Sequence, residues 1–241
     1  MSTVPVQASK WPKHVSPLTS EERAISDDFM NYWLSILPGK YGLVDRFNHG
    51  YSVSHAPATF LTTLEIGTGR GEHIQYENLS DEQLENYYAL DIRDNMAGVI
   101  KSRFPKVKTV LGDIQAGIDF ADGFFDRALA VHVLEHLPDL PRAIKETHRL
   151  LKADGQFSVV IPCEGGLTYA FAREISSKRI FEQRYKRPYK WFIEREHLNR
   201  PHEILEELEP YFSIADQTYF PMRIPMLHVN LCIGLTLKPK R

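Results

Sequence analysis

The sequence predicts an α/β fold in which helices cover both faces of an open, mostly parallel sheet. Apolar runs that end at a carboxylate or a glycine turn recur from residue 61 onward, with helical patterns between them. Alternation at this pitch is typical of a doubly wound sheet. The strands of this core are expected at residues 61–66, 86–91, 107–111, 127–132 and 156–161, and its helices at 95–104 and 140–151.

The first 55 residues are expected to form an arm and a helical cap. Three prolines predict an extended arm up to about residue 18. A helix should begin at Ser20 and end where Leu37-Pro-Gly39 interrupts it. Its apolar stripe is typical of a packing face, although such a helix could also cap a ligand cleft; the stripe consists of Phe29, Tyr32, Trp33 and Ile36.

Residues 163–200 break the strand and helix rhythm and predict a lid inserted after the fifth strand. This segment is aromatic and carries nine Lys or Arg against five Asp or Glu. A helix is expected next at 201–208, followed by strands near 212–219 and 228–237 that close the sheet edge as a hairpin-like pair. The whole chain, 1–241, is expected to be one domain.

Composition and charge argue against a nucleic-acid-binding protein, a disulfide or zinc framework and a membrane-spanning protein. The chain has 29 Lys plus Arg against 31 Asp plus Glu, which gives no electrostatic footprint for nucleic acid. Cys163 and Cys232 have neither disulfide nor zinc spacing, so we expect free thiols in a reducing, cytoplasmic setting and no metal. No signal peptide or membrane-spanning run is expected.

The most informative stretch is Thr63-Leu-Glu-Ile-Gly-Thr-Gly-Arg-Gly71, an apolar run that ends in an acidic residue and three glycines at alternate positions. Glycine allows a ligand to lie against the backbone of such a loop. The next two expected strands end at Asp91 and at Gly112-Asp113. Ligands of open parallel sheets bind at these strand ends, so the sequence predicts a binding site there.

With these motifs in place, residues 61–161 resemble the class I S-adenosylmethionine-dependent methyltransferases. The resemblance implies a Rossmann-like seven-stranded sheet with an antiparallel last strand, and S-adenosyl-L-methionine as cofactor, released as S-adenosyl-L-homocysteine. The motifs that carry it are Glu65 to Gly71, Leu90-Asp91, Gly112-Asp113, Phe125-Asp126, Val133 to Asp139 and Ile144 to Gly155.

The resemblance also implies a set of cofactor-binding residues. Glu65 would hold the ammonium side of the cofactor, Asp91 both ribose hydroxyls and Asp113 the adenine amino group. For the two aspartates, capping of their own loops is the alternative. The remaining expected contacts are Gly67, Thr68, Gly69 and Gly71 in the loop, Ile92, Gly112 and Ile114 around the adenine, and Val131 and His132 beside the donated methyl group.

A dinucleotide-binding oxidoreductase is the nearest rival. Gly67, Gly69 and Asp91 satisfy part of its fingerprint. That fingerprint requires glycine or alanine at position 72, where this chain has Glu72, and a carboxylate there would repel a pyrophosphate. We therefore expect methyl transfer rather than hydride transfer.

Methyl transfer requires mainly alignment of the acceptor and removal of its proton. We expect His132 or His136 to position or deprotonate the acceptor, with cofactor lining and turn capping as equally good alternatives. Glu196-His197 is a weaker acid/base candidate. The lid should bind the acceptor, because its basic and aromatic residues suit a phosphate, a carboxylate or a sugar ring. The alternative is that these residues are simply a solvated face. The expected acceptor-binding residues are Tyr169, Arg173, Arg184, Tyr185, Arg187, Trp191 and His197.

The predicted function is methyl transfer to an oxygen or nitrogen of a small molecule in biosynthesis, such as a sugar, a nucleotide-sugar or a polyketide-like compound. A non-catalytic scaffold or activator that still binds S-adenosylmethionine is the alternative. A homodimer formed through the arm or the lid is possible on either prediction.

Overall fold

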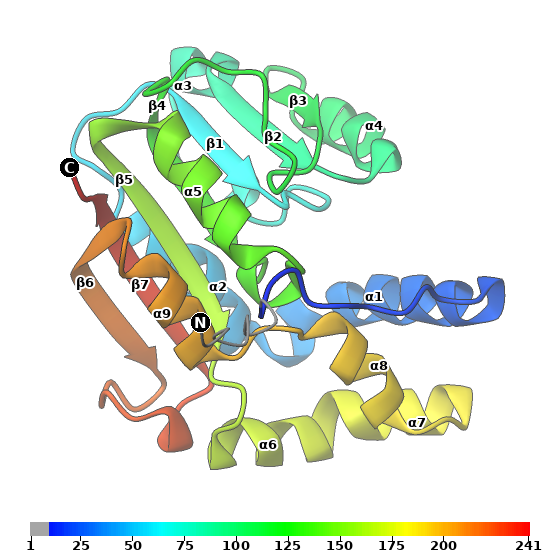
Figure 1. Cartoon of the computed structure of the whole chain (residues 1–241). Coiled ribbons are helices and arrows are strands. Elements are labelled where there is room, and N and C mark those ends of the chain that lie inside the picture. The colour runs from blue at the N-terminus through cyan, green and yellow to red at the C-terminus, as the bar shows by residue number, and fades with distance from the viewer. Residues whose placement is uncertain (1–9) are drawn as a thin grey trace, which may run out of the picture.

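The computed structural model describes residues 10–241, apart from the side chains of Leu34 and Pro38. Within that range the strands form a seven-stranded sheet of order β3-β2-β1-β4-β5-β7-β6, in which β7 is antiparallel to both of its neighbours (Figure 1). The strands are β1 (Thr63–Ile66), β2 (Tyr87–Asp91), β3 (Lys108–Leu111), β4 (Phe125–Val131), β5 (Leu151–Pro162), β6 (Phe212–Phe220) and β7 (Cys232–Pro239).

Helices cover both faces of this sheet. On one face α5 and α9 bury Leu140, Ile144 and Ile204 against strand residues such as Ala128 and Ala130. On the other face α2 and α4 contact the sheet. The helices are α1 (Ser20–Lys40), α2 (Gly42–Ser54), α3 (Asp81–Glu85), α4 (Asp94–Arg103), α5 (Leu140–Leu150), α6 (Leu167–Arg173), α7 (Arg179–Tyr185), α8 (Tyr189–Glu196) and α9 (Pro201–Leu208).

The predicted sheet and its antiparallel last strand are confirmed, with shifts at several boundaries. The last strand, expected near 228–237, is Cys232–Pro239, because Leu227–Val229 form a 3₁₀ helix. The helix expected at 140–151 ends at Leu150, because β5 already begins at Leu151. Residues 152–155 bulge before β5 resumes its register with β4 at Gln156. The Ala153-Asp-Gly155 turn signal thus lies inside a bulged strand rather than in a loop.

The cap differs from the prediction at Leu37-Pro-Gly39, where the helix does not end. Helix α1 continues to Lys40, and the Tyr41 N–H still donates to the Leu37 carbonyl. A proline in the last turn removes one donor without ending the helix. Helix α2 follows at once and was not predicted, because the side chains it buries are mostly polar: Asp45, Asn48, His49, Tyr51 and Ser52.

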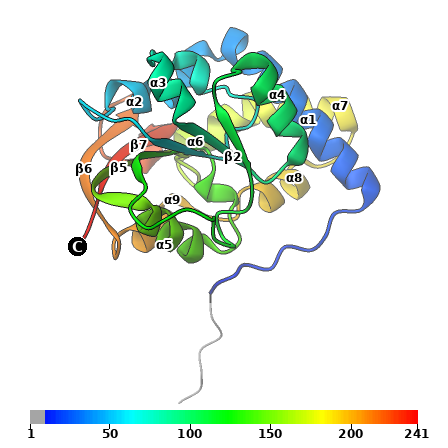
Figure 2. The same ribbon diagram turned by 90° about the horizontal axis from the view of Figure 1, so that it is seen from above.

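Cap and lid share an aromatic core of their own. Phe29 of α1 is 1 % exposed, and its ring centroid lies 5.0 Å from those of Phe181 in α7 and Phe192 in α8. In both views α1 runs beside α7 and α8 (Figures 1 and 2). The predicted packing face of α1 is therefore used against the lid.

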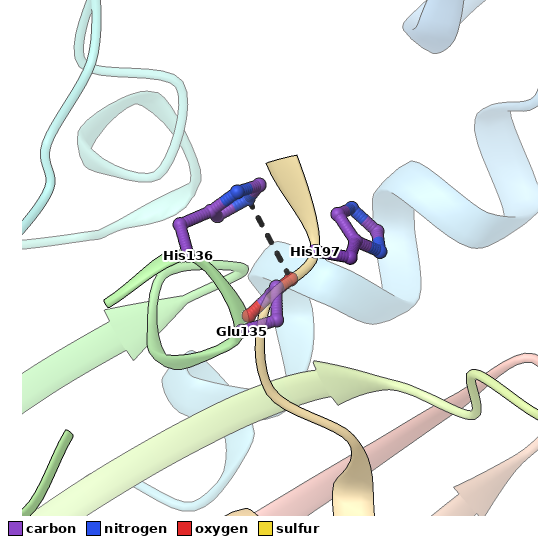
Figure 3. Close-up of side chains that lie close together, drawn as sticks. All are labelled: Glu135, His136 and His197. Carbon is purple, nitrogen blue, oxygen red and sulfur yellow. Dashed lines mark ion pairs between the residues drawn. The ribbon is translucent and has the colours of Figure 1, made fainter. Parts of the chain in front are cut away.

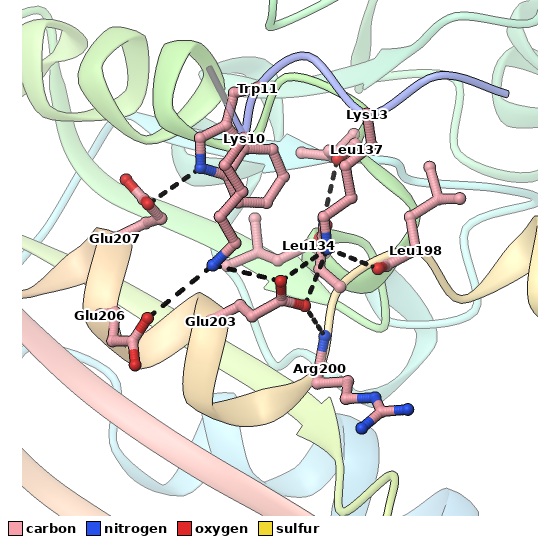
Figure 4. Close-up of polar contacts among 11 residues, drawn as sticks. Lys10, Trp11, Lys13, Leu134, Leu137, Leu198, Arg200, Glu203, Glu206 and Glu207 are labelled. Carbon is pink, nitrogen blue, oxygen red and sulfur yellow. Dashed lines mark hydrogen bonds and ion pairs between the residues drawn. The ribbon is translucent and has the colours of Figure 1, made fainter. Parts of the chain in front are cut away.

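The arm is fixed to α9 from residue 10 onward; its first nine residues lie outside the described range. Lys13 Nζ donates to the Glu203 carboxylate and to the Leu198 carbonyl, both at 2.8 Å (Figure 4). Trp11 Nε1 donates to Glu207 at 3.0 Å, and Lys10 pairs with Glu203 at 3.2 Å. Charged and aromatic side chains thus attach the arm beside the end of the lid.

Gly234 of β7 provides a test of how α2 packs on the sheet. A Cβ at this position would lie 2.5 Å from the Tyr51 ring, whereas a Cβ at Gly98 in α4 meets nothing within 4 Å. We expect Gly234→Ala to lower the free energy of unfolding by about 1–3 kcal/mol through overpacking. Gly98→Ala should raise it by about 0.5–1 kcal/mol. Urea unfolding of both variants measures these changes, and equal effects of the two would contradict the packing.

Glu203 should make the stability of the arm contact depend on pH. Burial raises its pKa, but the Arg200 N–H, Lys13 and Lys10 outweigh this and lower the pKa from 4.5 to about 2. The stabilisation is therefore complete above pH about 4.5 and is lost as pH falls toward about 2. We expect Glu203→Gln to lower the melting temperature near neutral pH and to converge with the parent at pH about 2. Glu206→Gln, at an exposed and weaker pair, is the control.

Candidate functional site

The glycine loop after β1 needs glycine at two positions for close approach. Gly67 has a φ of +68°, and a Cβ there would lie 2.6 Å from a methyl group of Val133. Gly71 has a φ of +83°, and its Cβ would lie 2.6 Å from the Phe104 ring. Only glycine adopts this backbone freely. The loop can therefore approach the end of β4 on one side and α4 on the other.

Glu65 lies beneath this loop rather than facing out of it. Its carboxyl group is buried and accepts a hydrogen bond from the Tyr87 hydroxyl at 2.9 Å. Burial raises its pKa to about 8, although the Tyr87 bond opposes the shift. The backbone carbonyl of Glu65 accepts from Thr68 Oγ1 at 3.1 Å, which joins the end of β1 to the loop. The contact of the Glu65 side chain with the ammonium side of the cofactor, directly or through water, stays a prediction.

Asp91 lies at the end of β2 with both carboxylate oxygens engaged. Its Oδ2 accepts the Gly69 N–H at 2.9 Å and Arg93 Nη2 at 3.0 Å. Its Oδ1 accepts Arg93 N and Nε, both at 3.0 Å. Burial raises the pKa of Asp91, but these bonds outweigh it and keep the pKa below its ordinary value. Since a carboxylate has about four acceptor positions, a ribose diol must displace the Arg93 guanidinium to bind here.

The strand end beside Asp91 offers a polar and an apolar contact suited to adenine. Asp113 Oδ1 accepts from the backbone and side chain of Gln115, both at 2.9 Å, and Oδ2 has no protein partner within the described residues. Ile92 and Leu111 are exposed by 65 % and 62 %. Ile114, expected to contact the ring, is instead buried in the core at 3 % exposure.

His132 occupies the turn at the end of β4. Its φ is +53°, and its N–H donates to the Val160 carbonyl of β5. Its Nδ1 lies 2.9 Å from Glu135 Oε1, and its Nε2 lies 4.0 Å from Cys232 Sγ. An Nδ1–H donated to the carboxylate leaves the lone pair on Nε2, which is the tautomer a general base requires.

Glu135, His136 and His197 meet beside that turn (Figure 3). Glu135 is fully buried, and His136 Nε2 lies 4.0 Å from its Oε1. Burial raises the pKa of Glu135, but the His132 bond and the neighbouring histidines lower it overall. Burial is also the main reason why the pKa of His136 is lowered. The rings of His136 and His197 lie edge to face, with centroids 5.1 Å apart.

Part of the lid faces this histidine cluster. Glu164, directly after β5, accepts from Arg173 at 2.7 Å and from His197 Nδ1. The Arg173 guanidinium lies 5.8 Å from the centre of the Tyr169 ring. Three of the expected acceptor-binding residues, Tyr169, Arg173 and His197, are thus gathered around one carboxylate.

The other four expected acceptor-binding residues have their polar partners on α1. Arg184 pairs with Asp28 at 2.9 Å, and the Tyr185 hydroxyl donates to the same carboxylate. Arg187 pairs with Glu21 at 2.7 Å, and Trp191 Nε1 donates to Glu22 at 3.0 Å. These side chains attach the lid to the cap, which is the reason for the basic composition of this part of the lid.

Four residues of the site were not expected from the sequence. Arg93 covers Asp91, Leu111 flanks Asp113, Glu135 pairs with His132, and Glu164 orients His197. The position of Leu111, at the end of an expected strand, could have indicated its exposure. No local pattern indicates the partners of Arg93 or Glu164.

The comparisons with known proteins agree with this geometry. Residues 64–159 match the family model described as "Methyltransferase domain". Human arginine-hydroxylase NDUFAF5 is 33 % identical over 102 residues, 42 % of this chain and 28 % of that protein. A probable S-adenosylmethionine-dependent methyltransferase of Mycobacterium tuberculosis, Rv3030, is 26 % identical over 158 residues, 66 % of this chain and 53 % of that protein. The matches thus span between about a quarter and a half of these relatives.

A solved structure extends the likeness of fold to nearly the whole chain. The 1,6-didemethyltoxoflavin-N1-methyltransferase of Burkholderia thailandensis superposes with a TM-score of 0.56 and 16 % identity, over 95 % of this chain and 94 % of its own. The sheet order, the glycine loop and the family match point to one class, the S-adenosylmethionine-dependent methyltransferases. Residues 64–159 are similar to a methyltransferase domain, and nearly the whole chain shares the fold of a solved methyltransferase.

S-adenosylmethionine is the cofactor of this class, and the strand ends fit it. The glycine loop, the Asp91 carboxylate and the free Oδ2 of Asp113 supply the polar contacts, and Ile92 and Leu111 the apolar ones. Among residues 10–241, no helix is both long and apolar enough to cross a membrane. Both cysteines are free and buried.

Asp91 and Arg93 should affect cofactor affinity in opposite directions. Removing the carboxylate deletes charge-assisted bonds worth about 1.5–3 kcal/mol each, so Asp91→Ala should raise the dissociation constant of S-adenosylhomocysteine about 10- to 100-fold. Arg93→Ala removes one bond from each carboxylate oxygen, while the Gly69 and residue-93 backbone N–H bonds remain, and should lower that constant. Isothermal titration calorimetry measures both, with exposed Asp119→Ala as control. Weaker binding in Arg93→Ala would mean that the guanidinium contacts the cofactor instead of competing with it.

Proposed function

We propose that this protein transfers a methyl group from S-adenosylmethionine to an oxygen or nitrogen of a small molecule. The observation that carries the proposal is the convergence of two groups of residues at one sheet edge. The glycine loop, Asp91 and Asp113 end the first three strands, and His132 ends β4 beside them. Cofactor and acceptor would therefore meet at the end of β4, as ligands do at the strand ends of open α/β sheets.

The chain's own residues have distinct tasks on this proposal. S-adenosylmethionine, when bound, supplies a methyl group attached to a positively charged sulfur. Asp91 and Asp113 would hold the ribose and the adenine, and the loop from Gly67 to Gly71 the remaining part. His132 Nε2 would accept the acceptor's proton while Glu135 holds its Nδ1, an arrangement that fixes tautomer and ring orientation.

The acceptor would lie between the end of β4 and Tyr169 in α6. Besides the histidines, this region contains the carboxylates of Glu135 and Glu164 and a single arginine, Arg173, which is already paired. Unpaired positive charge for a phosphate is therefore lacking among these residues. A neutral, hydroxyl-bearing molecule, such as a sugar or a polyketide-like compound, fits better than a nucleotide-sugar.

Three broader proposals accompany this one. Residues 1–241 would act as one domain, in which 163–200 is the lid and 1–55 the arm and cap.

The two free thiols suit a reducing, cytoplasmic setting. The apolar side chains Leu167, Phe171 and Ile175, exposed by 60–73 %, form the lid surface at which a homodimer would associate.

Hydroxylation, which would require an oxidant such as molecular oxygen as co-substrate, is a second candidate function. It is favoured by the human relative named as an arginine-hydroxylase, which matches 42 % of this chain. A non-catalytic scaffold that binds the cofactor remains the alternative to both. Mass spectrometry separates the three, because a product gains the mass of a methylene group, gains the mass of one oxygen atom, or is not formed.

His132→Asn tests the proposed base without straining the backbone, since asparagine tolerates a positive φ. Asparagine cannot take up the proton, so kcat should fall about 10²- to 10⁴-fold. Formation of S-adenosylhomocysteine would be followed with a panel of hydroxylated aromatics, sugars and sugar phosphates, and exposed His202→Ala is the control. Turnover within about threefold of the parent would remove the base assignment.

A further inference from the structure

The cluster of Glu135, His136 and His197 has the composition and geometry of a metal site. One ligand atom from each residue lies within 4.8 Å of the other two. Figure 3 shows the three side chains facing one another, two from the turn after β4 and one from the segment after α8. Bonds of ~2.1 Å place ligand atoms roughly 3–3.5 Å apart, so binding would draw these side chains inward by about 1 Å.

Each of the three side chains is already oriented through its other polar atom. His136 Nδ1 donates to the Glu196 carbonyl at 2.5 Å, and His197 Nδ1 donates to the Glu164 carboxylate. Both histidines therefore keep the lone pair on Nε2. Bonds of this kind to carboxylates and carbonyls fix the tautomer and orientation of metal-binding histidines.

The carboxylate of Glu135 is the third candidate ligand beside the two histidines. Glu135 Oε1 is held by His132, whereas Oε2 is buried and has no hydrogen-bond partner within residues 10–241. A fully buried oxygen without a partner costs free energy unless something satisfies it. Oε1 is the oxygen that faces His136, 4.0 Å from its Nε2 (Figure 3). An ion bound there would place a positive charge beside this buried carboxylate.

We propose that Glu135, His136 and His197 bind a divalent transition-metal ion. Two imidazoles and one carboxylate suit Zn²⁺, Fe²⁺ or Mn²⁺ rather than Ca²⁺, which prefers oxygen ligands. Three protein ligands leave positions open for water or substrate. If methyl transfer is the reaction, an acceptor hydroxyl could occupy an open position; this use of the ion rests on the function proposed above, whereas the metal site itself does not.

The site was not expected from the sequence, because His136 and His197 lie far apart in the chain and lack a common spacing motif. The segment after α8 brings them together. Leu198 and Asn199 donate their N–H groups to the Glu135 carbonyl at 2.8 and 3.0 Å. The third ligand is thus fixed to the turn that carries the other two.

Calorimetric titration of the full chain, after removal of metal with a chelator, tests the proposal. ZnCl₂ and, separately, MnCl₂ are the probes, and we expect one ion per chain for at least one of them. His136→Ala and His197→Ala should each weaken binding at least tenfold, whereas His202→Ala, on the exposed side of α9, should bind like the parent. Glu135 is left unchanged because its burial makes misfolding of a variant expected.

Co²⁺ absorption adds a readout that does not depend on activity. A visible band from nitrogen and oxygen ligation should appear in the parent and be lost in His197→Ala. Failure of the parent to take up any of these ions, or parent-like binding by both histidine variants, would overturn the site. Metal uptake without methylation of any acceptor would retain the site and count against methyl transfer, whereas methylation without metal uptake would overturn the site alone.

Discussion

The buried carboxylate of Glu135 is the constraint on which the arrangement of the site depends. Removing a carboxylate from water costs several kcal/mol, so its surroundings must compensate it. His132 does so from the end of β4, in a backbone conformation that few side chains adopt. Around the same turn, the Asn199 side chain donates to the carbonyls of Leu134 and Leu137. Strand end, turn and lid segment are consequently one hydrogen-bonded unit.

A second buried charge fixes the opposite end of β4. Arg127 is fully buried, pairs with Glu77 at 2.7 Å and donates to the Ser52 carbonyl of α2. Glu77 also pairs with His73, which follows the glycine loop. Strand β4 is thus connected to the glycine loop and to α2 through Arg127. It is connected to the lid through the turn that follows the strand. Because α2 faces this ionic network, its buried side is polar.

The sequence predicted what is local and missed what is assembled over long distances. The central strands β1, β2 and β4 were found because buried parallel strands are continuous apolar runs. The loop glycines and Asp91 could be placed at neighbouring strand ends because a strand end, a turn and a carboxylate are close together in sequence. Helix α2 was missed because apolar periodicity does not detect a helix that buries Asp45, Asn48 and His49. Ile114 was assigned to the cofactor because burial cannot be deduced from its position after a strand.

The charge of the lid is a second property that could not be predicted, because it depends on partners far away in the sequence. Nine basic residues against five acidic ones suggested an anionic acceptor, but this balance counts only residues within the segment. The partners of Arg184, Arg187 and Trp191 are acidic residues of α1, more than a hundred positions earlier in the chain. Those pairs use two of the four excess positive charges to attach the lid to the cap. On the proposed function the acceptor would meet a region of histidines and carboxylates, so its recognition should depend on hydrogen bonding and shape rather than on its net charge.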